Sequence, residues 1–200
     1  MKNLFVITVI LLIALSVSLS AQDKKKEVKT IPAAKIIPAP NQPSKAELER
    51  EPKLKDGMMV PDFEVPSMED PSVKYSKEGM IGKVYMIDFW ATWCGPCVGE
   101  MKTLHEAYNK FKNKGLEIIS FSCDAKPEDV APFRKDRWPM PWKHVFFGRG
   151  KECLYPKIKE DFDLRFIPSP FLIDKTGKIV AMGDELRGEK LIKTLEKFFD

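Results

Sequence analysis

A pair of cysteines restricts the folds open to this chain, because it lies where a strand pattern gives way to a helix pattern. Cys94-Gly95-Pro96-Cys97 follows residues 84–90 (VYMIDFW), an almost continuous apolar run typical of a strand covered on both faces. Beyond the pair, apolar residues recur at helical spacing as far as Phe111, and Asn113-Lys114-Gly115 is a typical helix stop. We therefore expect the two sulfurs at the first turn of a helix, at the carboxyl edge of a sheet, where such folds place their sites.

In the rest of residues 57–200, segments with the apolar pattern of a strand alternate with segments that have the apolar spacing of a helix. Strands are predicted over 61–65, 73–75, 84–90, 116–121, 143–147, 171–174 and 179–182, and helices over 98–111, 127–133, 155–162 and 191–199. Strands and helices that alternate, followed by a hairpin and a last helix, predict an α/β fold in which a mixed central sheet carries helices on both faces. The segment is long enough to bury a single core.

The first residues of the chain predict export. Met1-Lys2-Asn3 is a short positive start, Leu4–Leu19 is uncharged, and small residues at Ser20 and Ala21 precede a sharply polar stretch. This layout is typical of a secretory signal peptide over residues 1–21. The alternative is an uncleaved membrane anchor, although the apolar run is shorter than the roughly 20 residues that span a bilayer. We expect an exported protein of the periplasm or cell envelope, tethered to the membrane if the segment is retained.

Residues 22–56 differ in composition from the rest. Five prolines, many lysines and almost no aromatic residues cannot build a core, so this segment is predicted to be a disordered Pro/Lys-rich tether before a domain over 57–200. The chain has 33 basic and 29 acidic residues, and removing Lys2 and the tether leaves 23 of each in the domain. A balanced domain argues against a nucleic-acid partner, which would need a basic patch.

The spacing of Cys94 and Cys97 suits thiol–disulfide chemistry. Within one helical turn the two thiols can form a disulfide, and after one of them attacks a partner the other can resolve the mixed disulfide. The amino terminus of a helix favours a thiolate on the first cysteine. Pro96 is tolerated there because its missing N–H would have no helical partner. Cys94 is therefore the predicted nucleophile and Cys97 the resolving thiol.

A structural zinc site is an alternative use of the pair. Such a site needs four ligands, and the remaining candidates have no paired spacing: Cys123, Cys153, His105 and His144. We therefore expect no metal. An inert CxxC pair would require the surrounding strand–helix pattern to be accidental. Cys123 and Cys153 either form a second, structural disulfide or remain free buried thiols, and the sequence leaves both open.

The cysteine pair and its surroundings resemble the thioredoxin superfamily, and within it the exported TlpA/ResA-like branch. The likeness covers residues 57–200 and is carried by GMMVPDF at 57–63, GKV at 82–84, DFWATWCGPC at 88–97, IPSPFLID at 167–174 and LRG at 186–188. The resemblance implies a thioredoxin-like fold. It also implies a thiol–disulfide oxidoreductase that needs no cofactor beyond its redox-active Cys94–Cys97 disulfide.

The same resemblance implies how substrate would be bound. Pro168 would form a cis peptide bond and face the disulfide. The backbone of Ile167 would then pair with an extended substrate segment by strand addition. Trp93, Gly95 and Pro96 would contact substrate beside the disulfide. From the residues alone, Ile167-Pro168 is only a turn before a strand.

Two carboxyl groups complete the implied catalytic set. Asp88 lies within the apolar strand, six positions before Cys94, where burial of a carboxyl is costly and a purely structural role is hard to defend. Glu100 follows Cys97 by three positions, and the alternative for it is a solvated helix residue. A carboxyl in apolar surroundings has a raised pKa and can exchange protons near neutrality.

These features predict an exported protein-disulfide reductase. Gly95-Pro96 adds no charge or histidine that would over-stabilise the thiolate, which favours a thioredoxin-like reductant over a strong oxidant. The predicted partners are protein thiols and disulfides, apocytochrome c among them, and a membrane or periplasmic redox donor. The alternatives are a thiol peroxidase-related protein and a thioredoxin-like peptide-binding or chaperone module, although the second would not need both cysteines.

Overall fold

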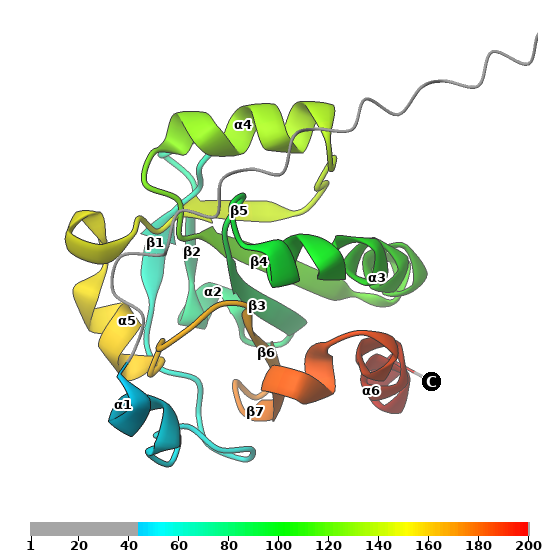
Figure 1. The fold of residues 1–200 in the computed structure, drawn as a ribbon. Coiled ribbons are helices and arrows are strands. Elements are labelled where there is room, and N and C mark those ends of the chain that lie inside the picture. Colours follow the sequence, from blue (N-terminus) through cyan, green and yellow to red (C-terminus); the bar gives the residue numbers. More distant parts are fainter. Residues whose placement is uncertain (1–43, 200) are drawn as a thin grey trace, which may run out of the picture. The chain divides into compact units, whose positions relative to one another are not determined.

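A mixed sheet forms the centre of the protein. The computed structural model describes residues 44–199. The strands of the sheet are β3 (Val84–Trp90), β4 (Leu116–Ser122), β5 (Lys143–Phe146), β6 (Ser169–Ile173) and β7 (Ile179–Met182). Their order is β5-β4-β3-β6-β7, in which β3, β4 and β5 are parallel while β6 and β7 are antiparallel to their neighbours (Figure 1). The predicted mixed α/β sheet is confirmed.

The apolar run at residues 84–90 forms the central strand, and all of its residues are buried. On one side β3 pairs in parallel with β4 along its whole length. On the other side it runs antiparallel to β6, where Asp88 lies opposite Pro170. Because both edges of β3 are hydrogen-bonded, the chain leaves the sheet at a fixed point after Trp90, just before the cysteine pair.

Helices and a short hairpin cover the two faces of the sheet. On one side α3 (Gly95–Phe111) and α6 (Glu189–Phe199) pack against each other (Figure 1). On the other side lie α5 (Pro156–Asp161) and the hairpin of β1 (Glu64–Pro66) and β2 (Lys74–Ser76). The remaining helices are α1 (Lys45–Glu49), α2 (Lys77–Met80) and α4 (Pro127–Asp136). Of these three helices, α4 corresponds to the helix predicted over 127–133.

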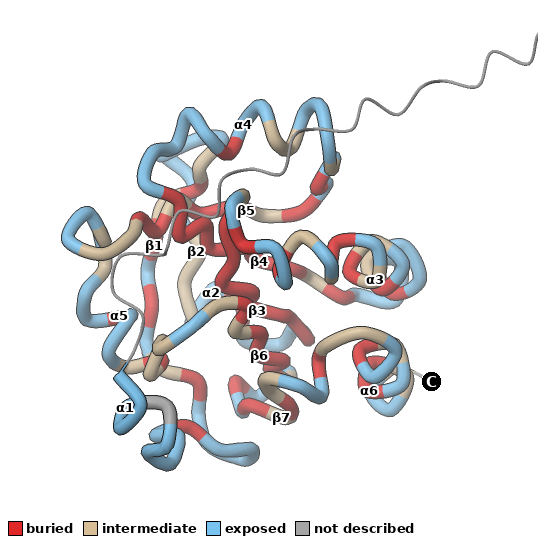
Figure 2. The backbone as a smooth tube through the Cα atoms, in the orientation of Figure 1, coloured by how far each residue is buried: buried red, intermediate tan, exposed pale blue. Residues whose placement is uncertain are grey.

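Phenylalanine rings fill the core on the α5 side of the sheet. Phe89 contacts the rings of Phe121, Phe147, Phe162 and Phe171, with centroids 4.9–6.3 Å apart. All of these side chains are buried, and Figure 2 shows buried residues concentrated along the central strands. Each such ring pair adds about 0.5–1.5 kcal/mol beyond the burial of its area. The packed rings give the residues that follow β3 a rigid support.

The segment before residue 57 differs from its prediction. Residues 44–56, expected to be the end of a disordered tether, form α1 and contact the domain. The Ser44 hydroxyl accepts the Glu47 N–H at 3.2 Å, and the Glu47 carboxylate accepts the Ser44 N–H at 2.7 Å, which together make a capping box. Further along, Leu54 is buried. The expected domain boundary is therefore too late, because composition does not reveal the polar contacts that hold this segment.

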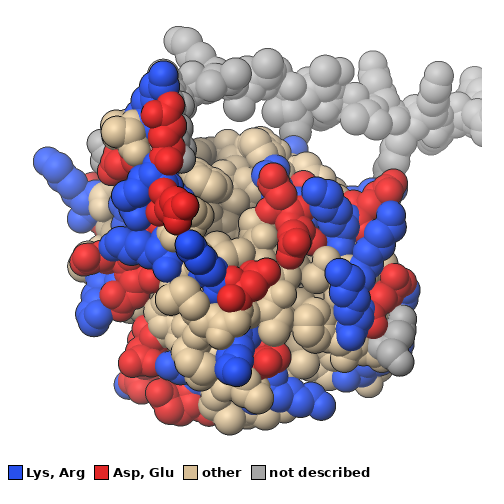
Figure 3. Space-filling view, turned by 90° about the horizontal axis from the view of Figure 1, so that it is seen from below, with Lys and Arg blue, Asp and Glu red and all other residues tan. Residues whose placement is uncertain are grey.

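The predicted signal peptide at residues 1–21, and residues 22–43 of the tether, lie outside the described residues. Within residues 44–199 no helix is both long and apolar enough to cross a membrane. On the face drawn in Figure 3, basic and acidic side chains are interleaved. This distribution agrees with the balance of charge that the sequence assigns to the domain.

Candidate functional site

The two cysteines of the CxxC pair form a disulfide at the start of α3. Their Cα atoms are 5.2 Å apart. Cys94 is the N-cap residue, Pro96 lies in the first turn, and the Cys97 N–H donates to Cys94 Sγ at 3.2 Å. The positive end of the helix and this N–H both act on Cys94 Sγ, so a thiolate there is stabilised after reduction. The expected position, at the junction of a strand and a helix, is confirmed.

Both cysteines of the pair are buried. Cys94 is 5 % exposed and Cys97 is 1 % exposed. The disulfide holds the Cys94 sulfur against the helix, so both residues are buried in this oxidised form. Cys94 remains the more accessible of the two, which agrees with the order of roles predicted for them.

The turn around the disulfide presents its other residues to solvent. Gly95 and Pro96 are exposed, and Trp93 is 45 % exposed. The guanidinium of Arg149 lies 5.0 Å from the centre of the Trp93 ring, a cation–π contact that the sequence pattern did not predict. Arg149 comes from the loop after β5, so this loop borders the active-site turn.

The fold brings four predicted site residues from three segments to one small cavity. Asp88 of β3, Cys97 and Glu100 of α3, and Pro168 line a cavity of about 20 Å³. The Ile167–Pro168 peptide bond is cis, as the resemblance implied. Ile167 itself is not part of the cavity lining and lies on the chain that enters β6. The predicted acids, the second cysteine and the cis-proline are thus adjacent.

Asp88 is an acid held in apolar surroundings. It is 6 % exposed, and burial raises its pKa from 3.8 to about 7, with the Glu100 carboxylate as a second cause. Glu100 is held by the loop before α6, since its Oε2 accepts the Gly188 N–H at 2.7 Å and its Oε1 lies 3.5 Å from Arg187 Nε. Glu100 is therefore anchored to the loop before α6 and is not the freely solvated residue of the alternative reading.

Asp124 is a further residue beside the active-site turn, and the sequence pattern did not predict it. Its carboxylate is fully buried and accepts hydrogen bonds from the Thr92 N–H at 3.1 Å, the Thr92 hydroxyl at 2.6 Å and the Ser122 hydroxyl at 2.8 Å. Burial raises the pKa of Asp124, and the bonds from Thr92 and Ser122 oppose that rise. The carboxylate fixes the turn that leads to Cys94. An acid two residues after the end of the apolar strand at 116–122 was the available signal.

Cys123 and Cys153 are free thiols in this structure. Cys123 is buried, and burial raises the pKa of its thiol, with Asp124 and Cys153 as further causes. Of the two arrangements left open by the sequence, the structure has the free thiols. Within the described residues, no cluster of three or more histidine, cysteine, aspartate or glutamate side chains could hold a metal ion.

Known proteins with similar sequences are named thiol-disulfide oxidoreductases. A family model described as thioredoxin-like matches residues 82–179. The thiol-disulfide oxidoreductase ResA of Bacillus thuringiensis is 32 % identical over 149 residues, which cover 74 % of this chain and 79 % of that protein. ResA of Oceanobacillus iheyensis is 36 % identical over 125 residues, 62 % of each chain.

Solved structures of similar fold agree with the sequence comparison. The thioredoxin domain of a thiol-disulfide oxidoreductase from Bacteroides vulgatus has a TM-score of 0.63 and 31 % identity, covering 74 % of this chain and all of that one. A thiol:disulfide interchange protein from a Bacteroides species has a TM-score of 0.61 and 31 % identity, covering 73 % and 91 %. Because the match to a ResA relative spans most of that relative at 32 % identity, the chain belongs to the thioredoxin-like family of thiol-disulfide oxidoreductases.

Proposed function

We propose that this protein reduces disulfides of protein substrates outside the cytoplasm, through the Cys94–Cys97 couple. The observation that carries the proposal is the placement of the disulfide at the amino terminus of α3, with its second cysteine, Cys97, on a cavity shared with cis-Pro168. The helix terminus favours a thiolate on Cys94, and the stretch around Pro168 offers a surface for an extended peptide. The thiol–disulfide names of the relatives support the same chemistry.

The exchange needs both sulfurs in turn. The Cys94 thiolate attacks one sulfur of a substrate disulfide, so a bond from Cys94 to substrate forms and the first substrate thiolate leaves. The Cys97 thiolate then attacks Cys94 Sγ, the mixed disulfide breaks, and the second substrate thiolate leaves. Two electrons pass to the substrate, and the enzyme ends with the Cys94–Cys97 disulfide present here. An external dithiol donor reduces this disulfide before the next cycle.

Asp88 is the proposed base for the second step. Cys97 must lose its proton, yet it is 1 % exposed and poorly reached by bulk water. A carboxyl with a pKa of about 7 can accept that proton at neutral pH. The cavity that Asp88 shares with Cys97 has about 20 Å³, which is room for about one water molecule as a relay. Glu100 acts on this step by raising the pKa of Asp88.

The proposed substrate surface surrounds cis-Pro168. The backbone of Ile167 lies just before β6 and offers a partner for an extended substrate segment. Phe166, two residues before Pro168, is 51 % exposed, and Trp93, next to Cys94, is 45 % exposed. Large aromatic side chains are enriched among residues that dominate protein contacts. These features support a protein substrate rather than a small disulfide alone.

The proposal also includes the direction of electron transfer and the location of the protein in the cell. Gly95-Pro96 adds no positive charge beside Cys94, which supports a reductant. The signal-peptide pattern of residues 1–21 supports export to the periplasm or cell envelope, where a membrane or periplasmic donor would supply electrons. Apocytochrome c is among the proposed substrates. A thiol peroxidase-related protein and a peptide-binding module are the competing assignments.

A trapping experiment tests the proposal. The reduced protein should reduce insulin disulfides with dithiothreitol as electron donor. Cys97→Ser should accumulate a mixed disulfide with insulin, because nothing resolves it, whereas the matched Cys94→Ser variant should form none. Trapping by Cys94→Ser alone would make Cys97 the nucleophile. A wild-type protein that leaves insulin oxidised, with no adduct on either variant, would reject the assignment.

A further inference from the structure

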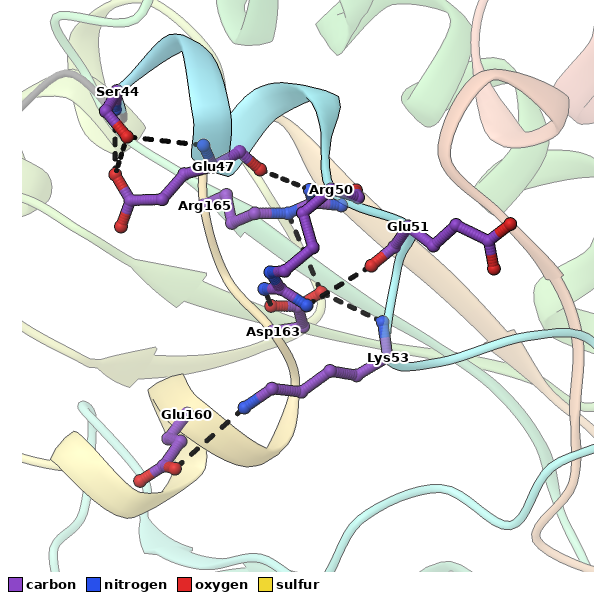
Figure 4. Close-up of polar contacts among 8 residues, drawn as sticks. All are labelled: Ser44, Glu47, Arg50, Glu51, Lys53, Glu160, Asp163 and Arg165. Atoms are coloured by element: carbon purple, nitrogen blue, oxygen red, sulfur yellow. Dashed lines mark hydrogen bonds and ion pairs between the residues drawn. The ribbon is translucent and has the colours of Figure 1, made fainter.

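The end of the amino-terminal segment is clamped to the turn that leads into the cis-proline. Figure 4 shows the contacts of residues 44–53 with Asp163 and Arg165. The Arg50 guanidinium pairs with the Asp163 carboxylate, and the Lys53 N–H donates to Asp163 Oδ2 at 3.0 Å. In the opposite direction, Arg165 Nη1 donates to the carbonyls of Glu47 at 2.6 Å and Arg50 at 2.8 Å. Residues more than a hundred positions apart are thus joined by reciprocal bonds.

These contacts lie in a partly buried setting. The side chains of Asp163 and Arg165 are 8 % and 13 % exposed, whereas that of Arg50 is 43 % exposed. Burial alone would raise the pKa of Asp163, but the Lys53 N–H and the Arg50 and Arg165 guanidiniums outweigh burial and lower that pKa. The carboxylate is therefore charged at neutral pH and has its partners in place, which distinguishes it from a solvated surface pair.

The backbone of Asp163 adopts a conformation that glycine favours. Its φ of 50° makes it the one residue other than glycine with a positive φ among residues 44–199. The turn ends α5, where the Asp163 N–H donates to the Glu160 carbonyl and the Leu164 N–H to the Lys159 carbonyl. Helices commonly end with glycine at this position, since glycine adopts the left-handed region freely. Aspartate is less favourable there for the backbone, and what it adds is the bonded carboxylate.

The clamped turn continues directly into the substrate surface. Residues 164–167 lead from Asp163 to the cis bond, and Phe166 on this stretch is 51 % exposed. The Ser169 hydroxyl donates to the Phe166 carbonyl at 2.6 Å, which joins the stretch to the start of β6. A pocket of about 450 Å³ lies beside Pro168, and residues Pro52 and Leu54, which follow α1, form part of its wall.

We propose that Asp163, held by Arg50 and Arg165, is a positioning residue that sets the substrate-binding stretch 164–168 for strand pairing with a protein substrate. This inference rests on the function proposed above. Asp163 touches no reacting atom. Its effect passes through the backbone, because a loose turn would let Ile167 sample orientations that do not match an extended partner.

Two variants distinguish the effect of the Asp163 carboxylate from the effect of the left-handed turn. Asp163→Gly keeps the left-handed turn and removes the ion pairs, and Arg50→Met removes one partner while leaving the turn residue unchanged. Lys45→Met is the matched control, since Lys45 lies on α1 and pairs with the exposed Glu49 at 3.6 Å. For each protein, KM and kcat are measured with insulin, and the rate is measured with a small disulfide, dithiobis(nitrobenzoic acid). Hydrogen exchange of the amides of residues 164–167 is followed alongside.

Both Asp163→Gly and Arg50→Met should raise the KM for insulin at least about threefold, and the small-disulfide rate should stay at the wild-type value. Exchange of the 164–167 amides should quicken at least about tenfold, with β3 amides unchanged as the internal reference. Lys45→Met should behave as wild type in every measurement.

Unchanged exchange at 164–167 in both variants would overturn the proposal. So would a parallel loss of activity on insulin and on the small disulfide, since a merely destabilised domain produces that result. A wild-type protein that reduces neither disulfide would reject the proposed function. The exchange data would still decide, in that case, whether Asp163 positions the stretch.

Discussion

Replacing Asp88 by asparagine should stabilise the oxidised protein by an amount that grows with pH. The buried Asp88 carboxyl has a pKa of about 7 in the folded protein and 3.8 as its ordinary value. Between these two values the folded protein holds a proton that the unfolded chain has released, so rising pH favours unfolding. At 1.36 kcal/mol per pH unit, the carboxyl costs at most about 4 kcal/mol of folding free energy once the pH exceeds 7.

Asparagine does not ionise, so Asp88→Asn is free of this pH-dependent cost. Its buried amide has a desolvation cost, but that cost is the same at every pH. The difference in unfolding free energy between variant and wild type should therefore rise by about 3 kcal/mol from pH 4.5 to pH 7, and level off above pH 7.

Urea unfolding of the oxidised proteins, at several pH values without reductant, measures this difference. Asp62→Asn is the control, because Asp62 is exposed and its hydrogen bond and ion pair with Lys77, at 2.7 Å, lower its pKa. Asp62 is then ionised in folded and unfolded protein throughout the range above about pH 5, so its variant should show a constant difference. A constant difference for Asp88→Asn would contradict this prediction, because it would mean that the buried carboxyl ionises at an ordinary pKa.

Two further predictions concern side chains near the disulfide. Because burial first and the Glu100 carboxylate second raise the pKa of Asp88, Glu100→Gln should move the acid limb of the pH–rate profile for insulin reduction to lower pH. An unchanged profile in this variant and in Asp88→Asn would show that solvent carries the Cys97 proton. Thiol titration of the unfolded, oxidised protein should find two free thiols, and in the folded protein Cys123 should be alkylated more slowly than Cys153, because burial raises the pKa of its thiol. Absence of free thiols would instead show a second disulfide.

Local sequence patterns were enough to predict the strand and the helix that position the cysteine pair. The apolar run at 84–90 predicts the central strand with its observed bounds, and helical spacing after Cys97 predicts α3. Both signals are local, since they depend on how neighbouring side chains distribute over the faces of one element. The order of the elements then predicts the mixed sheet, and with it the location of the cysteine pair at the carboxyl edge of β3.

The cis bond before Pro168 and the acids Asp88 and Glu100 came from the family resemblance rather than from local pattern. The structure confirms the cis bond and brings both acids next to Cys97. The catalytic roles of the acids stay predictions. Gly188 follows Glu100 by 88 positions. Nothing in the spacing of Glu100 indicated that its carboxylate would accept the Gly188 N–H.

Which distant polar groups meet depends on how the whole domain packs. Asp124 holds Thr92 across 32 positions, and Asp163 holds Arg50 across 113. The sequence around a charged loop residue looks the same whether its side chain contacts water or a buried partner. The difference does not show in the local sequence because the partner is determined by how whole helices and strands pack. The residues before 57 show this most clearly. Their composition predicted a tether, but their ion pairs and the burial of Leu54 make the last part of that segment a component of the folded domain.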